Sequence, residues 1–152
     1  MSAFLVIEHY SASDSVVNLS QLPVEGLLGC MGFVWVNPHI VRVFGEADSE
    51  NRQRVSIEIW RFNRRATTTG AFAAMRAAHR RPVTLWEFLR TSHRRPSTRR
   101  PVPLVCLGSV GRVARNDEVV PVITRRAAGL ELDFEWFEQS WSRDWYFACA
   151  CL

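Results

Sequence analysis

Lysine is absent from this sequence, and all 19 of its basic residues are arginine. A Walker phosphate-binding loop, a protein kinase and a Schiff-base enzyme each depend on a lysine side chain, so the sequence excludes these classes of protein. Arginine stays charged at physiological pH and presents a planar fork of donors that fits phosphate or carboxylate. The positive charges of this chain are therefore suited to binding anions.

Long apolar runs are also missing. No stretch reaches the roughly 18 consecutive apolar residues that indicate a membrane-spanning helix. Residues 1–10 lack the basic start and the long apolar centre of a secretory signal. We therefore expect a cytoplasmic protein that has no membrane among its partners.

Cysteine is scarce, and the four residues are Cys30, Cys106, Cys149 and Cys151. A chain of this length can build a core without disulfides, so we expect reduced, buried thiols. Two alternatives remain open: a four-thiolate zinc site, although the usual paired spacing is missing, and a loose prenylation signal in the last four residues. We expect neither a cofactor nor a metal.

Familiar catalytic motifs are absent too, including the nucleophile elbow, the zinc-protease motif and the glycine fingerprint. Glu131, Asp133 and Glu135 alternate along one expected strand and could hold a metal, but a solvated strand face has the same pattern. His9, beside Tyr10 and Ser11, and His39, after a proline turn, could act as general bases, yet none of these motifs accompanies them. The sequence therefore favours a non-catalytic protein over an enzyme.

The composition is that of a globular protein. Hydrophobic residues make up 47% of the 152 residues and charged residues 22%, which argues against disorder throughout. Six tryptophans and nine phenylalanines supply material for a core, since each buried aromatic removes about 150–250 Å² from water. We expect residues 1–152 to form a single domain.

Charge is distributed very unevenly along the chain. Residues 52–126 hold 17 arginines and four acidic residues, whereas the segments on either side are net acidic. The acidic ends could fold back and neutralise the middle within one domain. Alternatively, the middle could form a patch that attracts a polyanion.

The hydrophobic pattern predicts an α+β fold. We expect a mostly antiparallel sheet of about seven to nine short strands with a helical hairpin inserted near residues 70–93. The expected strands cover 3–10, 31–36, 40–44, 54–62, 104–108, 110–115, 118–124, 130–137 and 144–151. The strand at 54–62 alternates apolar and polar residues, which indicates one buried face, whereas the strand at 144–151 is apolar on both faces and should lie inside the sheet.

The helical hairpin is predicted from local signals. Residues 70–81 are rich in alanine, and Pro82 should end that helix near Arg81. Thr84 and Glu87 form a capping-box pattern, so a second helix should begin near Leu85. The two helices could form a DNA-reading helix-turn-helix, but the turn lacks glycine, and an ordinary helical hairpin packed on the sheet is the alternative.

One motif recurs: His79-Arg80-Arg81-Pro82 is repeated as His93-Arg94-Arg95-Pro96, and Arg99-Arg100-Pro101 is a partial third copy. Cations near helix C-termini explain the first two pairs, but they do not explain the third. The candidate binding residues are therefore six arginines and one tryptophan: Arg80, Arg81, Arg94, Arg95, Arg99, Arg100 and Trp86.

Two functions follow as hypotheses. In the first, the arginines bind the phosphates of RNA or DNA, and Trp86 or Trp60, if exposed, stacks on bases. In the second, the chain is a protein-interaction module that docks on an acidic protein surface. An inhibitor of a nucleic-acid-handling complex, of the kind that phages encode against bacterial defences, is an example of the second class. The sequence does not specify the oligomeric state.

Overall fold

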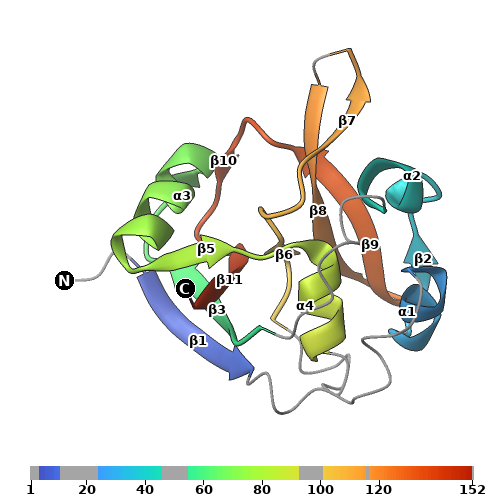
Figure 1. Cartoon of the computed structure of the whole chain (residues 1–152), viewed down its shortest axis with the longest axis horizontal. Helices are drawn as coiled ribbons and strands as arrows, with labels where there is room; N and C mark the ends of the chain where they lie inside the picture. Colours follow the sequence, from blue (N-terminus) through green and yellow to red (C-terminus); the bar gives the residue numbers. More distant parts are fainter. Residues whose placement is uncertain (1–3, 11–23, 46–54, 93–100, 116, 152) are drawn as a thin grey trace.

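A computed structural model describes residues 4–10, 24–45, 55–92, 101–115 and 117–151, and shows them as a mixture of helices and strands (Figure 1). The helices are α1 (Val24–Cys30), α2 (Ile40–Phe44), α3 (Thr68–Ala77) and α4 (Leu85–Ser92). The strands are β1 (Phe4–Tyr10), β2 (Trp35–Val36), β3 (Ile57–Phe62), β4 (Ala66–Thr67), β5 (Arg80–Pro82), β6 (Leu104–Val105), β7 (Gly111–Ala114), β8 (Asp117–Arg126), β9 (Gly129–Trp136), β10 (Ser140–Trp141) and β11 (Tyr146–Cys151). The predicted α+β class is confirmed.

Nine of these strands form one sheet. Its main path runs β1-β3-β11-β6-β8-β9-β2, with β5 paired to β11 and β7 paired to β8. Most neighbours are antiparallel, but β6 runs parallel to β11 and β2 runs parallel to β9. The sheet is therefore mixed, and β4 and β10 form a small antiparallel pair apart from it.

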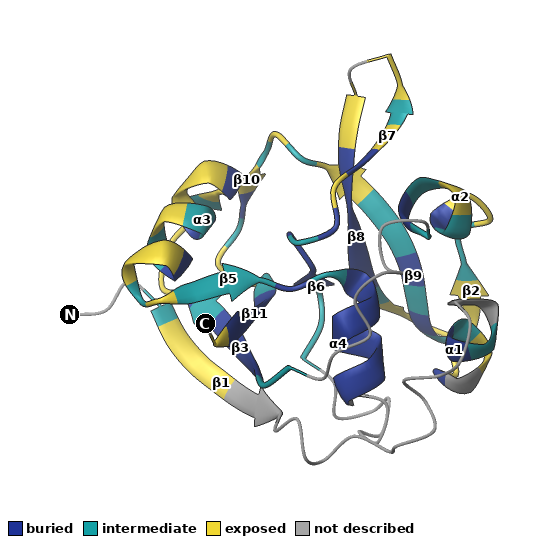
Figure 2. Ribbon diagram, viewed as in Figure 1, coloured by how far each residue is buried: buried dark blue, intermediate teal, exposed yellow. Residues whose placement is uncertain are grey.

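Both faces of the sheet are covered. Since successive strand residues point to opposite sides, neighbouring residues of one strand pack in different hydrophobic clusters. In β6, Leu104 packs in one hydrophobic cluster with residues of α1, α2 and α4, whereas Val105 packs in a second cluster with residues of α3. In β8, Ile123 belongs to the first cluster and Val122 to the second. Helices thus cover the sheet on both sides, and Figure 2 shows α4 buried along its described length while α3 keeps an exposed side.

The prediction that the strand at 54–62 is half-buried is wrong. Glu58 and Trp60, on its expected wet face, are 8% and 1% exposed. Phe4 of β1 stacks on the Trp60 ring with centroids 3.5 Å apart, and Trp60 belongs to the cluster that includes α3. This buried position tolerates a glutamate because Arg80 and the Trp60 indole both donate hydrogen bonds to the Glu58 carboxylate.

A helical hairpin is not shown at 70–93, because a strand separates the two helices. Helix α3 ends at Ala77, and His79 takes a positive φ of 56°, after which β5 pairs antiparallel with β11. Pro82, which has no N–H to donate, is the last residue of β5. The central strand β11 therefore gains a short extra neighbour where the sequence pattern predicts a turn between helices.

The capping box that opens α4 is confirmed. The Thr84 backbone N–H donates to Glu87 Oε1 at 2.9 Å, and the Glu87 N–H donates to Thr84 Oγ1 at 3.1 Å. The Leu85 N–H donates to the Ser109 hydroxyl at 2.8 Å, which satisfies another amide of the first turn. Helix α4 accordingly begins at Leu85, as expected.

The strand predicted at 40–44 is helix α2 instead. Ile40 and Phe44 are both buried, which places residues four apart on one face of a helix. Asn37 Oδ1 accepts a hydrogen bond from the His39 N–H at 2.9 Å, so the Asn37-Pro38 turn leads directly into the helix. The predicted strand at 31–36 is reduced to the two residues of β2.

The cysteines of the described residues carry no disulfide. Cys106 and Cys149 are buried, and burial raises the pKa of both thiols, whereas Cys151 is exposed. In the part of the chain that the structure describes, no helix is long and apolar enough to cross a membrane. The strand at 144–151 does lie inside the sheet, since β11 has β3 on one side and β6 on the other.

Candidate functional site

The first predicted arginine, Arg80, is engaged by a carboxylate of its own chain. Its Nη2 lies 2.7 Å from Glu58 Oε1, and its Nε donates to the same oxygen at 3.1 Å. These hydrogen bonds raise the pKa of Arg80. An outside phosphate would have to compete with a buried carboxylate for this guanidinium.

Arg81 forms a similar pair with Glu87 of α4. Nη1 and Nη2 donate to the two carboxylate oxygens at 3.1 and 2.7 Å, which is a bidentate arrangement. Burial acts to raise the pKa of Glu87, but the hydrogen bonds from Arg81 and Thr84 outweigh it, so the pKa is lowered. Arg81 therefore links β5 to the capping box of α4.

Trp86 is in the core and is only 1% exposed. Its Nε1 donates to the Phe44 carbonyl oxygen at 2.9 Å, and Trp60 is equally buried. Neither indole has a free face for a base. The other predicted contacts, Arg94, Arg95, Arg99 and Arg100, lie outside the described residues.

Other arginines are exposed and have no ion pair within the described residues. They are Arg42, Arg64, Arg65, Arg76, Arg112, Arg115 and Arg143. Two of them, Arg64 and Arg65, are adjacent in the turn between β3 and β4 and line the same cleft. That cleft therefore combines two positive charges with a concave surface.

The arginine cleft, as we name it, has a volume of about 490 Å³. It is lined by Phe62, Arg64, Arg65, Ala66, Thr67, Gly70 and Ala74. No acidic side chain occurs among the described lining residues or in the first turn of α3. Among the described lining residues, no acidic side chain therefore offsets the positive end of the α3 dipole and the two guanidinium groups.

The rim of the cleft is held in place by the start of α3. Thr67 caps the helix by accepting the Gly70 N–H at 3.0 Å. The next residue, Thr68, is 3% exposed and accepts a hydrogen bond from the Trp141 indole at 2.9 Å while donating to the Phe137 carbonyl. This anchoring fixes the helix end that borders the cleft.

Sequence reasoning missed this cleft because Arg64 and Arg65 lie outside the repeated His-Arg-Arg-Pro motif. A signal was present: Arg64-Arg65 is also an arginine pair, and only residues 66–69 separate it from the expected helix at 70–81. Basic residues just before a helix N-terminus are placed where that helix also attracts anions. The position of Arg64-Arg65 before the expected helix was therefore the sequence signal for a basic cleft, and the repeated motif was not.

Two carboxylates of the acidic strand face at 131–135 have partners of their own in the structure. Glu131 pairs with Arg126 at 3.2 Å, and Asp133 accepts a hydrogen bond from the Asn37 amide at 2.9 Å. Burial, and then the charge of Asp133, raise the pKa of Glu135. Within the described residues no group of three possible ligands could hold a metal ion.

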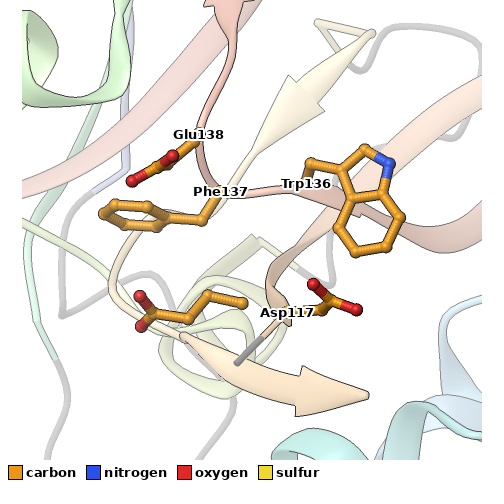
Figure 3. A pocket seen from close by; sticks show the side chains of 5 residues that line it. Asp117, Trp136, Phe137 and Glu138 are labelled. Atoms are coloured by element: carbon orange, nitrogen blue, oxygen red, sulfur yellow. The ribbon is translucent and has the colours of Figure 1, made fainter. Parts of the chain in front are cut away.

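A second concavity, the Trp136 pocket, lies where β9 ends beside the start of β8. It has a volume of about 250 Å³ and is lined by Asp117, Glu118, Trp136, Phe137 and Glu138. Figure 3 shows Trp136 above Asp117, with Phe137 next to Glu138 on the other side. Aromatic and acidic side chains thus share this pocket, and its charge is opposite to that of the arginine cleft.

Comparisons with known proteins place the chain in no family. No protein-family model, no curated protein and no solved structure matches it. Its function has to be inferred from the geometry of its own surface.

Proposed function

We propose that this protein is a non-catalytic binder of nucleic-acid phosphate and that the arginine cleft is one of its contact points. The observation that carries the proposal is the pair of exposed guanidinium groups of Arg64 and Arg65, which have no ion pair among the described residues and border a cleft whose described lining has no acidic side chain. Arg94, Arg95, Arg99 and Arg100 belong to the same proposal as further phosphate contacts. Arg80, Arg81 and Trp86 do not, because internal partners already engage them.

The shape of the cleft supports a phosphate ligand. Its volume of about 490 Å³ is at the scale of small-ligand pockets. Arginine binds phosphate through two parallel N–H donors, and a helix N-terminus adds partial positive charge. Phosphate groups recur along RNA and DNA, so such a cleft would bind without reading sequence.

The test is binding of a labelled oligonucleotide of about 20 nucleotides, followed by fluorescence anisotropy over a range of salt concentrations. The double substitution Arg64→Ala/Arg65→Ala should weaken binding at low salt. It should also reduce the slope of log affinity against log salt by about 1.4 on a single strand, because each lost phosphate contact contributes about 0.7.

The matched control is Arg125→Ala/Arg126→Ala, which removes two adjacent exposed arginines that already have interactions of their own. It changes the net charge equally and should leave the slope nearly unchanged. Equal losses in both double variants would show only a general charge effect. Failure of the unsubstituted protein to bind at low salt would remove the proposal altogether.

A further inference from the structure

Trp136 combines an exposed indole with a concave surface, whereas Trp35, which is 43% exposed, lines none of the concavities described above. Trp136 is 54% exposed, whereas Trp60, Trp86 and Trp141 are each 1% exposed. It is the last residue of β9 and pairs with Val119 of β8, so the sheet fixes its backbone. Tryptophan is enriched among the residues that dominate protein–protein interfaces.

Three carboxylates surround this aromatic surface. Asp117, Glu118 and Glu138 are all exposed, and none has an ion pair among the described residues. Arg112 lies opposite Glu118 in the β7–β8 register but forms no ion pair with it. The Phe137 N–H donates to the Glu118 carbonyl oxygen at 3.0 Å and joins the two sides of the pocket.

We propose that the Trp136 pocket is a docking site for an arginine-bearing segment of a partner protein. Charge complementarity selects this occupant: the pocket offers carboxylates to a cation, and the indole face attracts a guanidinium. A pocket of about 250 Å³ suits a single long side chain better than a folded element. This site is separate from the arginine cleft and goes beyond the proposed nucleic-acid binding.

The probe is a fluorescent Gly-Arg-Gly-Arg-Gly peptide, and binding is measured by anisotropy at low salt. Trp136→Ala should weaken binding by about threefold to thirtyfold, because it removes the cation–π contact. Glu138→Gln, which keeps the shape of the side chain, should also weaken it. The same peptide with citrulline in place of arginine, which lacks the charge, should bind poorly.

The matched controls change an exposed tryptophan and an exposed carboxylate that lie outside the pocket. Trp35→Ala removes another tryptophan, 43% exposed in β2, and Asp144→Asn neutralises an exposed carboxylate that is not in the pocket. Both should bind the peptide as the unsubstituted protein does, and so should Arg64→Ala/Arg65→Ala. That last variant separates a failure of this site from a failure of the arginine cleft.

Three results would overturn the proposal. In the first, Trp136→Ala and Glu138→Gln both bind the peptide normally. In the second, light scattering shows self-association that Trp136→Ala abolishes, which makes a second copy the occupant. In the third, Trp136→Ala loses oligonucleotide binding but keeps peptide binding, which assigns the pocket to nucleic acid.

Discussion

Several arginines of this chain stabilise its own fold. Arg80 and Arg81 are adjacent in β5, and each pairs with a different carboxylate, Glu58 in the sheet and Glu87 at the start of α4. The carboxylates are 8% and 4% exposed, so the pairs are partly removed from water. In such surroundings, loss of one partner costs more than the pair itself contributes, because the remaining charge stays buried.

Arg80→Ala should therefore destabilise the protein clearly. We expect a loss of about 2–4 kcal/mol in the free energy of unfolding, below the cost for a completely buried pair because Arg80 is partly exposed. The control Arg126→Ala removes an arginine whose side chain is 67% exposed, and it should cost no more than about 0.5 kcal/mol. Urea unfolding measures both, and equal losses would contradict the structural role of Arg80.

Glu87 should make stability depend on acid pH. Its pKa is lowered in the folded protein, so its stabilising effect is complete above the unfolded pKa of about 4.3 and is lost as pH falls through the folded value. The stability difference between the unsubstituted protein and Glu87→Gln should thus shrink below about pH 4. Thermal unfolding of both proteins from neutral to acid pH measures it; a constant difference would contradict the prediction.

At the level of elements, local signals predicted some boundaries well and missed others. The Thr84–Glu87 capping box predicted the start of α4 because its two partners are only three residues apart and can be recognised in the sequence. The strand β5 has no such signal: its pairing with β11 joins residues far apart in sequence, such as Arg81 and Ala150. For the same reason the Glu58–Arg80 pair, which removes one candidate from the binding site, was not visible in the sequence.

The turn between β6 and β7 should be intolerant of added side-chain atoms. A Cβ on Gly108 would collide with the Val83 backbone and lie 2.7 Å from the Thr84 nitrogen, just before α4. Gly108→Ala should cost about 2 kcal/mol or more, since backbone has to move. Gly29→Ala in α1, where a Cβ meets nothing within 4 Å, should instead stabilise by about 0.5–1 kcal/mol. Thermal unfolding compares the two, and a well-tolerated Gly108→Ala would refute the close approach.

At the scale of the whole molecule, the described arginines of the basic middle segment do not all serve one basic surface. The middle segment supplies both the arginine cleft and the internally paired arginines, and it also contributes Asp117 and Glu118 to the acidic Trp136 pocket. Composition predicted the abundance of anion-binding groups. Which of them are free depends on tertiary contacts, and those were not contained in the charge pattern.

The single nine-stranded sheet leads to a prediction about cooperativity. Strands from both ends of the described chain, such as β1 and β11, belong to this sheet, and buried clusters lie on both of its faces. We expect one unfolding transition in urea, with tryptophan fluorescence and far-ultraviolet circular dichroism changing together. Two separated transitions would show that parts of the chain fold independently.

The position of β11 has a consequence for the order in which the protein is assembled during translation. Residues 146–151 leave the ribosome after the other strands of the described residues, yet they belong between β3 and β6. Until they arrive, the edges of β3 and β6 that pair with β11 in the folded protein have no partner there. Completion of the described sheet therefore waits on β11, which is made after its neighbours β3 and β6.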